Sequence, residues 1–162
     1  MVKKTMAILG DTGKFSLVVM QDLMKQDLRL LFISKDETKK FELKKQLGPI
    51  NGAALTEVEF TSCERDGCWE ADIIAITGKE NISIALIQKI KEVATQKTVL
   101  IISEENKKSG SHDLVKSLPN SNVIEIQIET PVKEFRLSGM DPNSLTEIKF
   151  IFENAGYQHK NK

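Results

Sequence analysis

Residues 4–16, KTMAILGDTGKFS, join a short apolar run, a turn marked by glycines and the beginning of a helical pattern. The run over 6–9 is apolar on both faces, which predicts a buried parallel strand. Gly10 ends this run, Gly13 follows three residues later, and the small residue Ser16 comes three further on. A buried strand, a glycine turn and a helix start in this order predict a backbone that wraps a phosphate.

The chemistry of this turn suits an anion. Gly10 can turn tightly at the strand end, and Gly13 lets a phosphate approach the backbone. Free amides at the helix start, together with the helix macrodipole, favour negative charge there. Asp11 opposes this interpretation, because a carboxylate beside a pyrophosphate is repulsive unless it points to solvent. A turn that binds nothing is the alternative. The residues predicted to bind are Gly10, Thr12, Gly13, Lys14 and Phe15.

Length and composition bound the possible functions. The 162 residues suffice for one domain with a sizeable core. The formal net charge is zero, which argues against a protein built mainly to neutralise nucleic-acid phosphates or an anionic membrane surface. No apolar run approaches the ~20 residues that span a bilayer, and the first one is too short for a signal peptide. We therefore expect a cytoplasmic protein that binds neither nucleic acid nor membrane.

Apolar runs alternate with helical patterns, which predicts a parallel sheet with helices on both faces. Strands are predicted over 4–9, 28–33, 57–61, 72–77, 99–103, 123–128 and 135–139, the sixth of them nearer the sheet edge. Helices are predicted over 14–26, over 36–47, from 80 or 81, over 112–118, and from Pro142 to Gly156. Residues 66–70 should form a loop or one helical turn, and those from 159 onward should be frayed. Right-handed crossovers then bring the ends of the first, second, fourth and fifth strands to one edge, where such sheets bind ligands.

The end of the second strand favours one nucleotide over another. Ser34 and Lys35 follow this strand, with Lys39 and Lys40 on the next turn. An enzyme for NAD usually has an acidic residue here, which accepts from the ribose 2′-hydroxyl. A hydroxyl and a cation suit a 2′-phosphate instead, so the sequence predicts NADP. The acidic residues 36–37 weaken this interpretation, and a solvated, charged helix start is the alternative.

Other candidates are weaker. Thr77 and Gly78 follow the fourth strand, where a loop would lie over the pyrophosphate and the nicotinamide ribose; a simple turn is the alternative.

Cys63 and Cys68 lack further metal ligands at suitable spacing, so we expect structural or incidental thiols. We expect His112 on the surface rather than in acid–base chemistry. The sequence contains no nucleophile elbow, P-loop or metal motif, and it identifies no catalytic residue.

Most of the chain resembles a known family. Residues 8–16 resemble the ILGGTGNLG-type turn of the deazaflavin (coenzyme F-420)-dependent NADP reductases, and residues 32–40 resemble their strand that ends in Ser-Arg and holds the 2′-phosphate. Residues 71–77 and 97–103 are similar to their fourth and fifth strands, and 135–158 to the strand, turn and helix that follow. The resemblance implies an α/β, three-layer Rossmann-like fold, with a mostly parallel sheet and helices on both faces.

The resemblance also implies one NAD(P)-binding domain over residues 1–156, followed by a tail over 157–162. In this family hydride passes between the nicotinamide and a bound deazaflavin, and positioning does the work rather than side-chain acid–base catalysis. We expect NADP as the cofactor, with NAD less favoured. The family's C-terminal segment, which helps to build the second-substrate site and the dimer, has no counterpart after the last helix. We therefore expect an unidentified small-molecule redox partner rather than a deazaflavin; a homodimer is compatible with the resemblance. The NADP ligands it implies are Gly10, Thr12, Gly13, Ser34, Lys35 and Thr77.

The sequence leaves three classes of function open. The glycine turn and the end of the second strand favour an NADP-dependent oxidoreductase. Asp11 and the short C-terminus favour a non-catalytic nucleotide sensor, or an interaction module with a degenerate dinucleotide site. The weakest hypothesis is that the chain is a relative of the nucleoside-diphosphate-sugar epimerases, because it lacks a Tyr-x-x-x-Lys pair and its only tyrosine is Tyr157.

Overall fold

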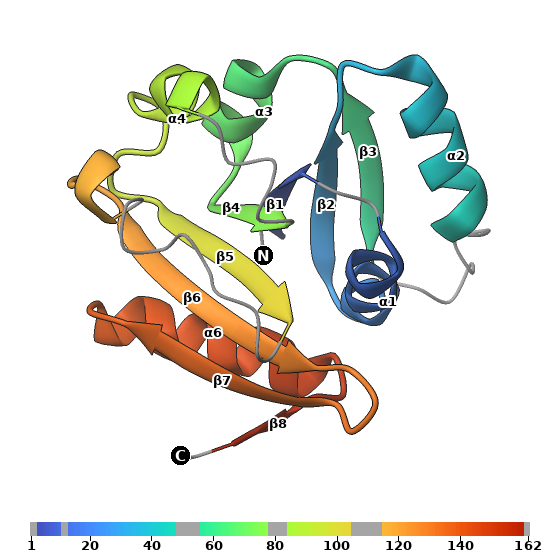
Figure 1. Ribbon diagram of the computed structural model, residues 1–162, viewed down its shortest axis with the longest axis vertical. Helices are drawn as coiled ribbons and strands as arrows, with labels where there is room; N and C mark the ends of the chain where they lie inside the picture. The colour runs from blue at the N-terminus through green and yellow to red at the C-terminus, as the bar shows by residue number, and fades with distance from the viewer. Residues whose placement is uncertain (1–2, 11–12, 48–55, 78–83, 105–114, 161–162) are drawn as a thin grey trace.

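A computed structural model describes residues 3–10, 13–47, 56–77, 84–104 and 115–160, which form an eight-stranded sheet flanked by helices (Figure 1). The strands lie in the order β3-β2-β1-β4-β5-β6-β7-β8. In chain order they are β1 (Lys4–Gly10), β2 (Leu28–Ile33), β3 (Glu57–Thr61), β4 (Ile73–Thr77), β5 (Thr98–Glu104), β6 (Asn122–Glu129), β7 (Glu134–Gly139) and β8 (Gln158–His159). The helices are α1 (Lys14–Leu23), α2 (Glu37–Leu47), α3 (Glu64–Glu70), α4 (Ile84–Ile90) and α6 (Pro142–Asn154).

The predicted fold class is confirmed. All pairings from β3 across to β6 are parallel, and only the β6–β7 pair is antiparallel. Parallel strands joined by right-handed crossovers end at the same edge. The end of β1 therefore lies between the ends of β2 and β4. From β1 the chain first extends the sheet to one side through β2 and β3, and it then extends the sheet to the other side from β4 onward.

Each face of the sheet carries its own hydrophobic core, because the apolar strands are buried on both sides. On one face, α1, α2 and α6 pack through residues such as Leu23, Leu43 and Phe152. On the other face, α3 and α4 pack through Cys68 and Ile90. No helix within the described residues is long and apolar enough to cross a membrane.

Several local predictions are wrong for physical reasons. The expected loop or single turn near residue 66 is the seven-residue helix α3, whose Gly67 lets it approach β2: a Cβ there would lie 2.6 Å from Ile33 Cδ1. On α2 only Leu43 is buried, and Phe41 is 68% exposed. Two residues along a helix correspond to about 200° of rotation, so these two side chains point in opposite directions. Helix α1 ends at Leu23 rather than near 26.

The C-terminal residues also differ from the expectation. β6 is nearer an edge than β4 and β5, as predicted, but the antiparallel β7 and the short β8 continue the sheet beyond it. The frayed end predicted from His159 is wrong at His159 and Lys160: the first lies in β8, and the amide of the second donates to Phe135 O at 2.8 Å. Tyr157 is buried against α1 and α6. Apolar and hydrogen-bonding contacts therefore hold residues 157–160 against the sheet.

A buried carboxylate ties α1 to this C-terminal region. Asp22 accepts hydrogen bonds from Tyr157 Oη at 2.8 Å, Lys25 Nζ at 2.7 Å and Lys133 Nζ at 3.3 Å. Burial alone would raise the pKa of Asp22, but these hydrogen bonds outweigh it and hold the pKa below the usual value. The charged carboxylate is therefore the form that stabilises the fold.

Replacing Asp22 with Asn is expected to lower the free energy of unfolding at pH 7 by about 2–4 kcal/mol. The substitution removes the buried negative charge that accepts hydrogen bonds from Tyr157, Lys25 and Lys133. Since the pKa of Asp22 is lowered in the folded protein, its contribution is complete above about pH 4 and disappears as the pH falls through the folded-state pKa. Urea denaturation at pH 7 and pH 3 measures both effects. Asp27→Asn, which breaks an exposed 3.2 Å ion pair with Lys3, should cost under about 1 kcal/mol. Equal costs for the two variants would contradict the role given to Asp22.

Candidate functional site

The candidate site lies where β1, β2 and β4 end, at the point where the chain switches direction across the sheet. In open α/β sheets this crevice is the usual ligand-binding position. Gly10 is paired with Thr77 at the ends of β1 and β4. Gly10 has φ +115°, and a Cβ there would lie 1.8 Å from Thr77 O. Only glycine fits this close approach, as the predicted role of Gly10 in a tight turn requires.

The side chain of Thr77 helps to join the two strands. Thr77 is buried, and its Oγ1 donates to Leu9 O at 3.3 Å. This hydroxyl therefore bridges β4 to β1 at the floor of the crevice. Thr77 also lines the pocket described below.

At the beginning of α1, the first backbone amides have no partner among the described residues. Gly13 is the N-cap in an extended conformation, and within the described residues no side chain caps this helix. The first helical hydrogen bond runs from Leu17 N to Gly13 O at 2.9 Å, so the amides of residues 14–16 have no partner within the helix. The first turn carries no acidic residue. These donors and the helix macrodipole favour an anion in front of α1.

The neighbouring helix α2 begins differently. Asp36 Oδ1 accepts from the amides of Thr38 at 2.9 Å and Lys39 at 3.2 Å. Ser34 Oγ accepts from Asp36 N at 3.2 Å. The negative charge of Asp36, which weakened the sequence-based case for NADP, is thus engaged by the first turn of α2. Of the two helices beside the crevice, α1 is the one whose start is not capped by a carboxylate among the described residues.

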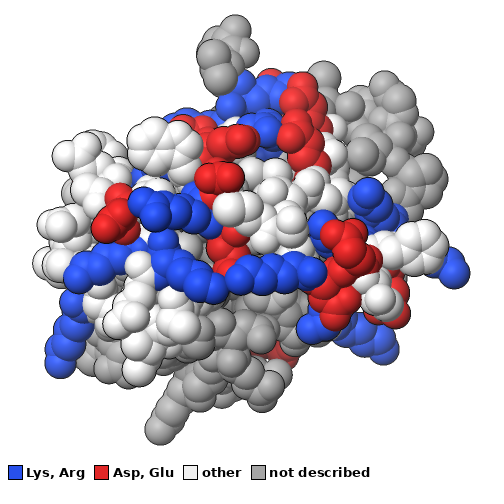
Figure 2. All heavy atoms as spheres, turned by 90° about the horizontal axis from the view of Figure 1, so that it is seen from above, with Lys and Arg blue, Asp and Glu red and all other residues white. Residues whose placement is uncertain are grey.

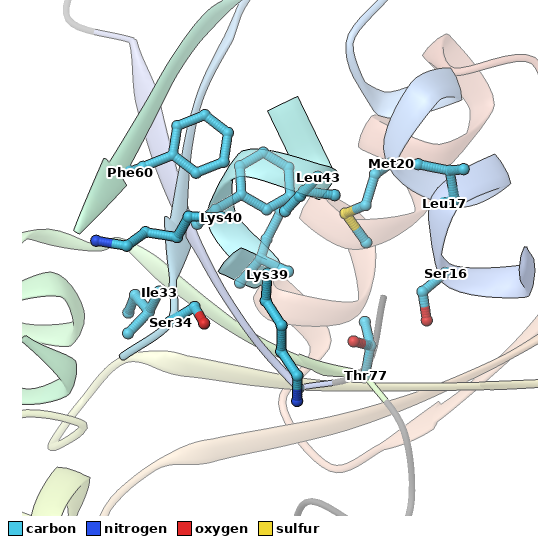
Figure 3. A pocket seen from close by; sticks show the side chains of 13 residues that line it. Ser16, Leu17, Met20, Ile33, Ser34, Lys39, Lys40, Leu43, Phe60 and Thr77 are labelled. Atoms are coloured by element: carbon cyan, nitrogen blue, oxygen red, sulfur yellow. The ribbon is translucent and has the colours of Figure 1, made fainter. Parts of the chain in front are cut away.

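A pocket opens between α1 and α2 over the ends of the strands (Figure 3). Its empty volume is about 510 Å³ when the open mouth is included. Leu17 and Met20 of α1 face Leu43 of α2 across it, as Figure 3 shows. The lining residues are Ile8, Gly10, Ser16, Leu17, Met20, Phe32, Ile33, Ser34, Lys39, Lys40, Leu43, Phe60 and Thr77. The pocket therefore has an apolar interior, with hydroxyl groups and two lysines towards the ends of the strands.

The two lysines differ in their surroundings. Lys40 Nζ lies 2.8 Å from Glu37 Oε1, and only 14% of its side chain is exposed. Lys39 is exposed and has no ion-pair partner among the described residues. In Figure 3 the side chain of Lys39 extends towards Thr77, whereas that of Lys40 runs past Ile33 in the other direction. Among the described lining residues, Lys39 is thus the lysine without an ion-pair partner at this mouth.

The structure brings some of the predicted residues together and separates one from them. Those that line the pocket are Gly10, Ser34 and Thr77. Those at the start of α1, next to the lining residue Ser16, are Gly13, Lys14 and Phe15. Lys35 does not line the pocket, because its Nζ lies 3.0 Å from Glu64 Oε1 on α3. Thr12 and Gly78, and with them Asp11 and His112, lie outside the described residues.

Sequence reasoning did not identify the apolar wall of the pocket. Phe60 stacks on Phe32 with ring centroids 5.3 Å apart, and Lys44 Nζ lies 4.9 Å from the Phe60 centroid. Met20 and Leu43 complete the wall from the helices. The alternation in β3 and the helical spacing in α1 and α2 indicate that these side chains point into the space between the helices and the sheet. Nothing in that spacing distinguishes a closed core from one with an opening.

The cysteines are not arranged for metal binding. Cys63 is exposed and Cys68 is buried, and burial raises the pKa of the Cys68 thiol to about 12. Within the described residues, no three His, Cys, Asp or Glu side chains gather as metal ligands would. Basic and acidic side chains are interspersed on the face seen from above Figure 1, rather than separated into one large basic surface (Figure 2).

Comparison with known proteins identifies the fold. No protein-family model matches the chain, and no curated protein matches it. A structure from Arthrobacter sp. FB24, provisionally named as an F-420-dependent NADP reductase, superposes with a TM-score of 0.71 at 14% identity. That match covers 95% of this chain and 82% of the other.

Two larger enzymes match with similar quality. Pyrroline carboxylate reductase from Plasmodium falciparum, solved with NADP bound, gives a TM-score of 0.65 at 15% identity over 99% of this chain. Arogenate dehydrogenase from Synechocystis gives 0.70 at 13% identity over 96% of this chain. The present chain spans 58% of the length of each of them. The chain therefore has the Rossmann-like fold shared by these reductases and dehydrogenases, as its resemblance to the F-420-dependent NADP reductases predicted.

Proposed function

We propose that this protein binds NADP(H) at the ends of β1, β2 and β4 and acts as an oxidoreductase on an unidentified small molecule. The observation that carries the proposal is the arrangement around the pocket: the start of α1, which no described side chain caps, at one side, and Ser34 with Lys39 at the other. An extended dinucleotide needs an anion site for its pyrophosphate and, in NADP, a second one for the 2′-phosphate.

The residues at the two anion sites suit these roles. The amides of residues 14–16 would hold the pyrophosphate, with Gly10 and Gly13 allowing its close approach. Ser34 and Lys39 would contact the 2′-phosphate, and Lys35 is near enough in sequence to join them. The names of two structural neighbours include NADP, which supports a nicotinamide dinucleotide as the ligand. When bound, this cofactor would supply the hydride, and the chain's role would be to position it.

Nucleotide binding is measured most directly by thermal unfolding of the whole chain. NADPH at ~100 times its dissociation constant should stabilise the protein by about 2.7 kcal/mol, which corresponds to a rise in Tm of about 5–10 °C for a domain of this size. NADH at the same concentration should raise Tm less. If neither NADPH nor NADP shifts Tm, and calorimetric titration also detects no binding, the proposal is wrong. A larger shift with NADH than with NADPH would exclude the preference for NADP.

Measuring the oxidation of NADPH distinguishes an oxidoreductase from a nucleotide sensor. An oxidoreductase should oxidise bound NADPH when a suitable hydride acceptor is added, which is followed by the loss of absorbance of the reduced nicotinamide. A sensor would bind NADPH with the same preference and leave it reduced across a panel of free flavins, deazaflavin and small carbonyl compounds.

A further inference from the structure

One carboxylate beside the candidate site is contacted by two lysines. Glu64, the first residue of α3, has its Oε1 3.0 Å from Lys35 Nζ and 3.5 Å from Lys89 Nζ. Lys35 follows β2 directly after Ser34, and Lys89 belongs to α4. Because both nitrogens contact the same oxygen atom, a single oxyanion can bridge these two ammonium groups.

Among the described residues, the charges in this cluster are not balanced. Two lysines face one carboxylate, whereas the adjacent Arg65 forms a one-to-one pair with Glu92 at 3.0 Å. The side chains of Lys35 and Lys89 are 63% and 51% exposed, but that of Glu64 is only 19% exposed. The cluster therefore presents an excess of positive charge to solvent, with its carboxylate underneath.

The position of the cluster relates it to the pocket. Ser34 lines the pocket, and the next residue, Lys35, is drawn away from it by Glu64. Exposed ion pairs contribute little free energy, so a doubly charged phosphate can replace a carboxylate at such a pair of lysines. A carboxylate left beside that phosphate would repel it.

Resting on the function proposed above, we propose that Glu64 competes with the 2′-phosphate of NADP for Lys35 and Lys89. In the unliganded protein Glu64 holds both lysines at α3; when NADP binds, its 2′-phosphate beside Ser34 and Lys39 draws the ammonium groups of Lys35 and Lys89 away from the carboxylate. NAD, which lacks this phosphate, leaves the cluster as it is. Glu64 is then a specificity-determining residue that weakens the preference for NADP.

Replacing Glu64 with Gln tests this competition. The NADPH dissociation constant should fall about three- to tenfold, since Lys35 and Lys89 are released and the repulsion is removed. The NADH dissociation constant should change less than about twofold. Glu92→Gln is the matched control, because it makes the same charge change at a neighbouring ion pair that does not contact Lys35. This control should leave both dissociation constants unchanged.

A second set of variants tests whether the two lysines carry the effect. In a chain with Lys35→Gln and Lys89→Gln, NADPH should bind more weakly, and adding Glu64→Gln should no longer tighten it. If wild-type protein prefers NADPH but Glu64→Gln leaves that preference unchanged, or alters NADPH and NADH binding equally, the competition is excluded and the proposed function stands. If the wild type binds neither nucleotide, the proposed function fails and the competition with it.

Discussion

Replacing Gly10 with Ala is expected to lower the free energy of unfolding by about 3 kcal/mol or more, a large part of the stability of a domain this size. Two effects add. The backbone of Gly10 has φ +115°, which a residue with a Cβ rarely adopts, and the added Cβ would lie 1.8 Å from Thr77 O. The oxygen belongs to the backbone of β4, so relief of the contact requires two central strands to separate. Urea denaturation measures the loss.

A second glycine separates these two effects. Gly156, after α6, also has a positive φ, +99°, but nothing lies within 4 Å of a Cβ built there. Gly156→Ala should therefore cost only the backbone strain, about 1 kcal/mol. If Gly10→Ala costs no more than Gly156→Ala, the approach of β1 to β4 is not what requires glycine. Any NADPH binding that survives in Gly10→Ala should also be weaker, because Thr77 and the start of α1 depend on this junction.

The fold was predictable because its central strands β1, β2, β4 and β5 are apolar on both faces. Runs such as 73–77 and 98–104 can be buried only in a sheet covered on two sides, and their alternation with helical patterns implies parallel order. Gly67 shows where such patterns fail. An Asp-Gly pair usually marks a turn, but here the glycine allows α3 to pack against Ile33. The partner that decides between these outcomes is far away in the sequence.

The candidate site was less predictable, because side-chain direction decides it. Ser34 and Lys35 are neighbours, yet one lines the pocket and the other pairs with α3. Sequence position places both residues at the end of β2, but it does not reveal that Glu64, on a distant helix, pairs with Lys35. In the sequence, Lys39 and Lys40 only added to the case that Ser34 and Lys35 make for a 2′-phosphate. Its place at the pocket follows from Asp36, which caps α2 and sets where the first turn begins.

Reversing the charge of Lys39 is expected to separate NADP from NAD. In Lys39→Glu the NADPH dissociation constant should rise about 100-fold, since a charge-assisted hydrogen bond is lost and repulsion of the 2′-phosphate is added. The NADH dissociation constant should rise less than about threefold, because the proposal gives Lys39 a contact with the 2′-phosphate, which NADH lacks, and leaves the pyrophosphate to the start of α1. Calorimetric titration with both nucleotides at fixed ionic strength gives the two constants.

Lys45→Glu makes the same charge change on the same helix. Lys45 is exposed in the last turn of α2 and does not line the pocket. If long-range attraction between α2 and an anionic ligand were responsible, both variants would weaken NADPH and NADH together, and the effect would vanish at high salt. A direct contact with the 2′-phosphate predicts a loss confined to Lys39→Glu and to NADPH. Equal losses for both nucleotides in Lys39→Glu would instead place Lys39 at a group that NADP and NAD share, and the preference for NADP would have to come from Lys35 and Lys89.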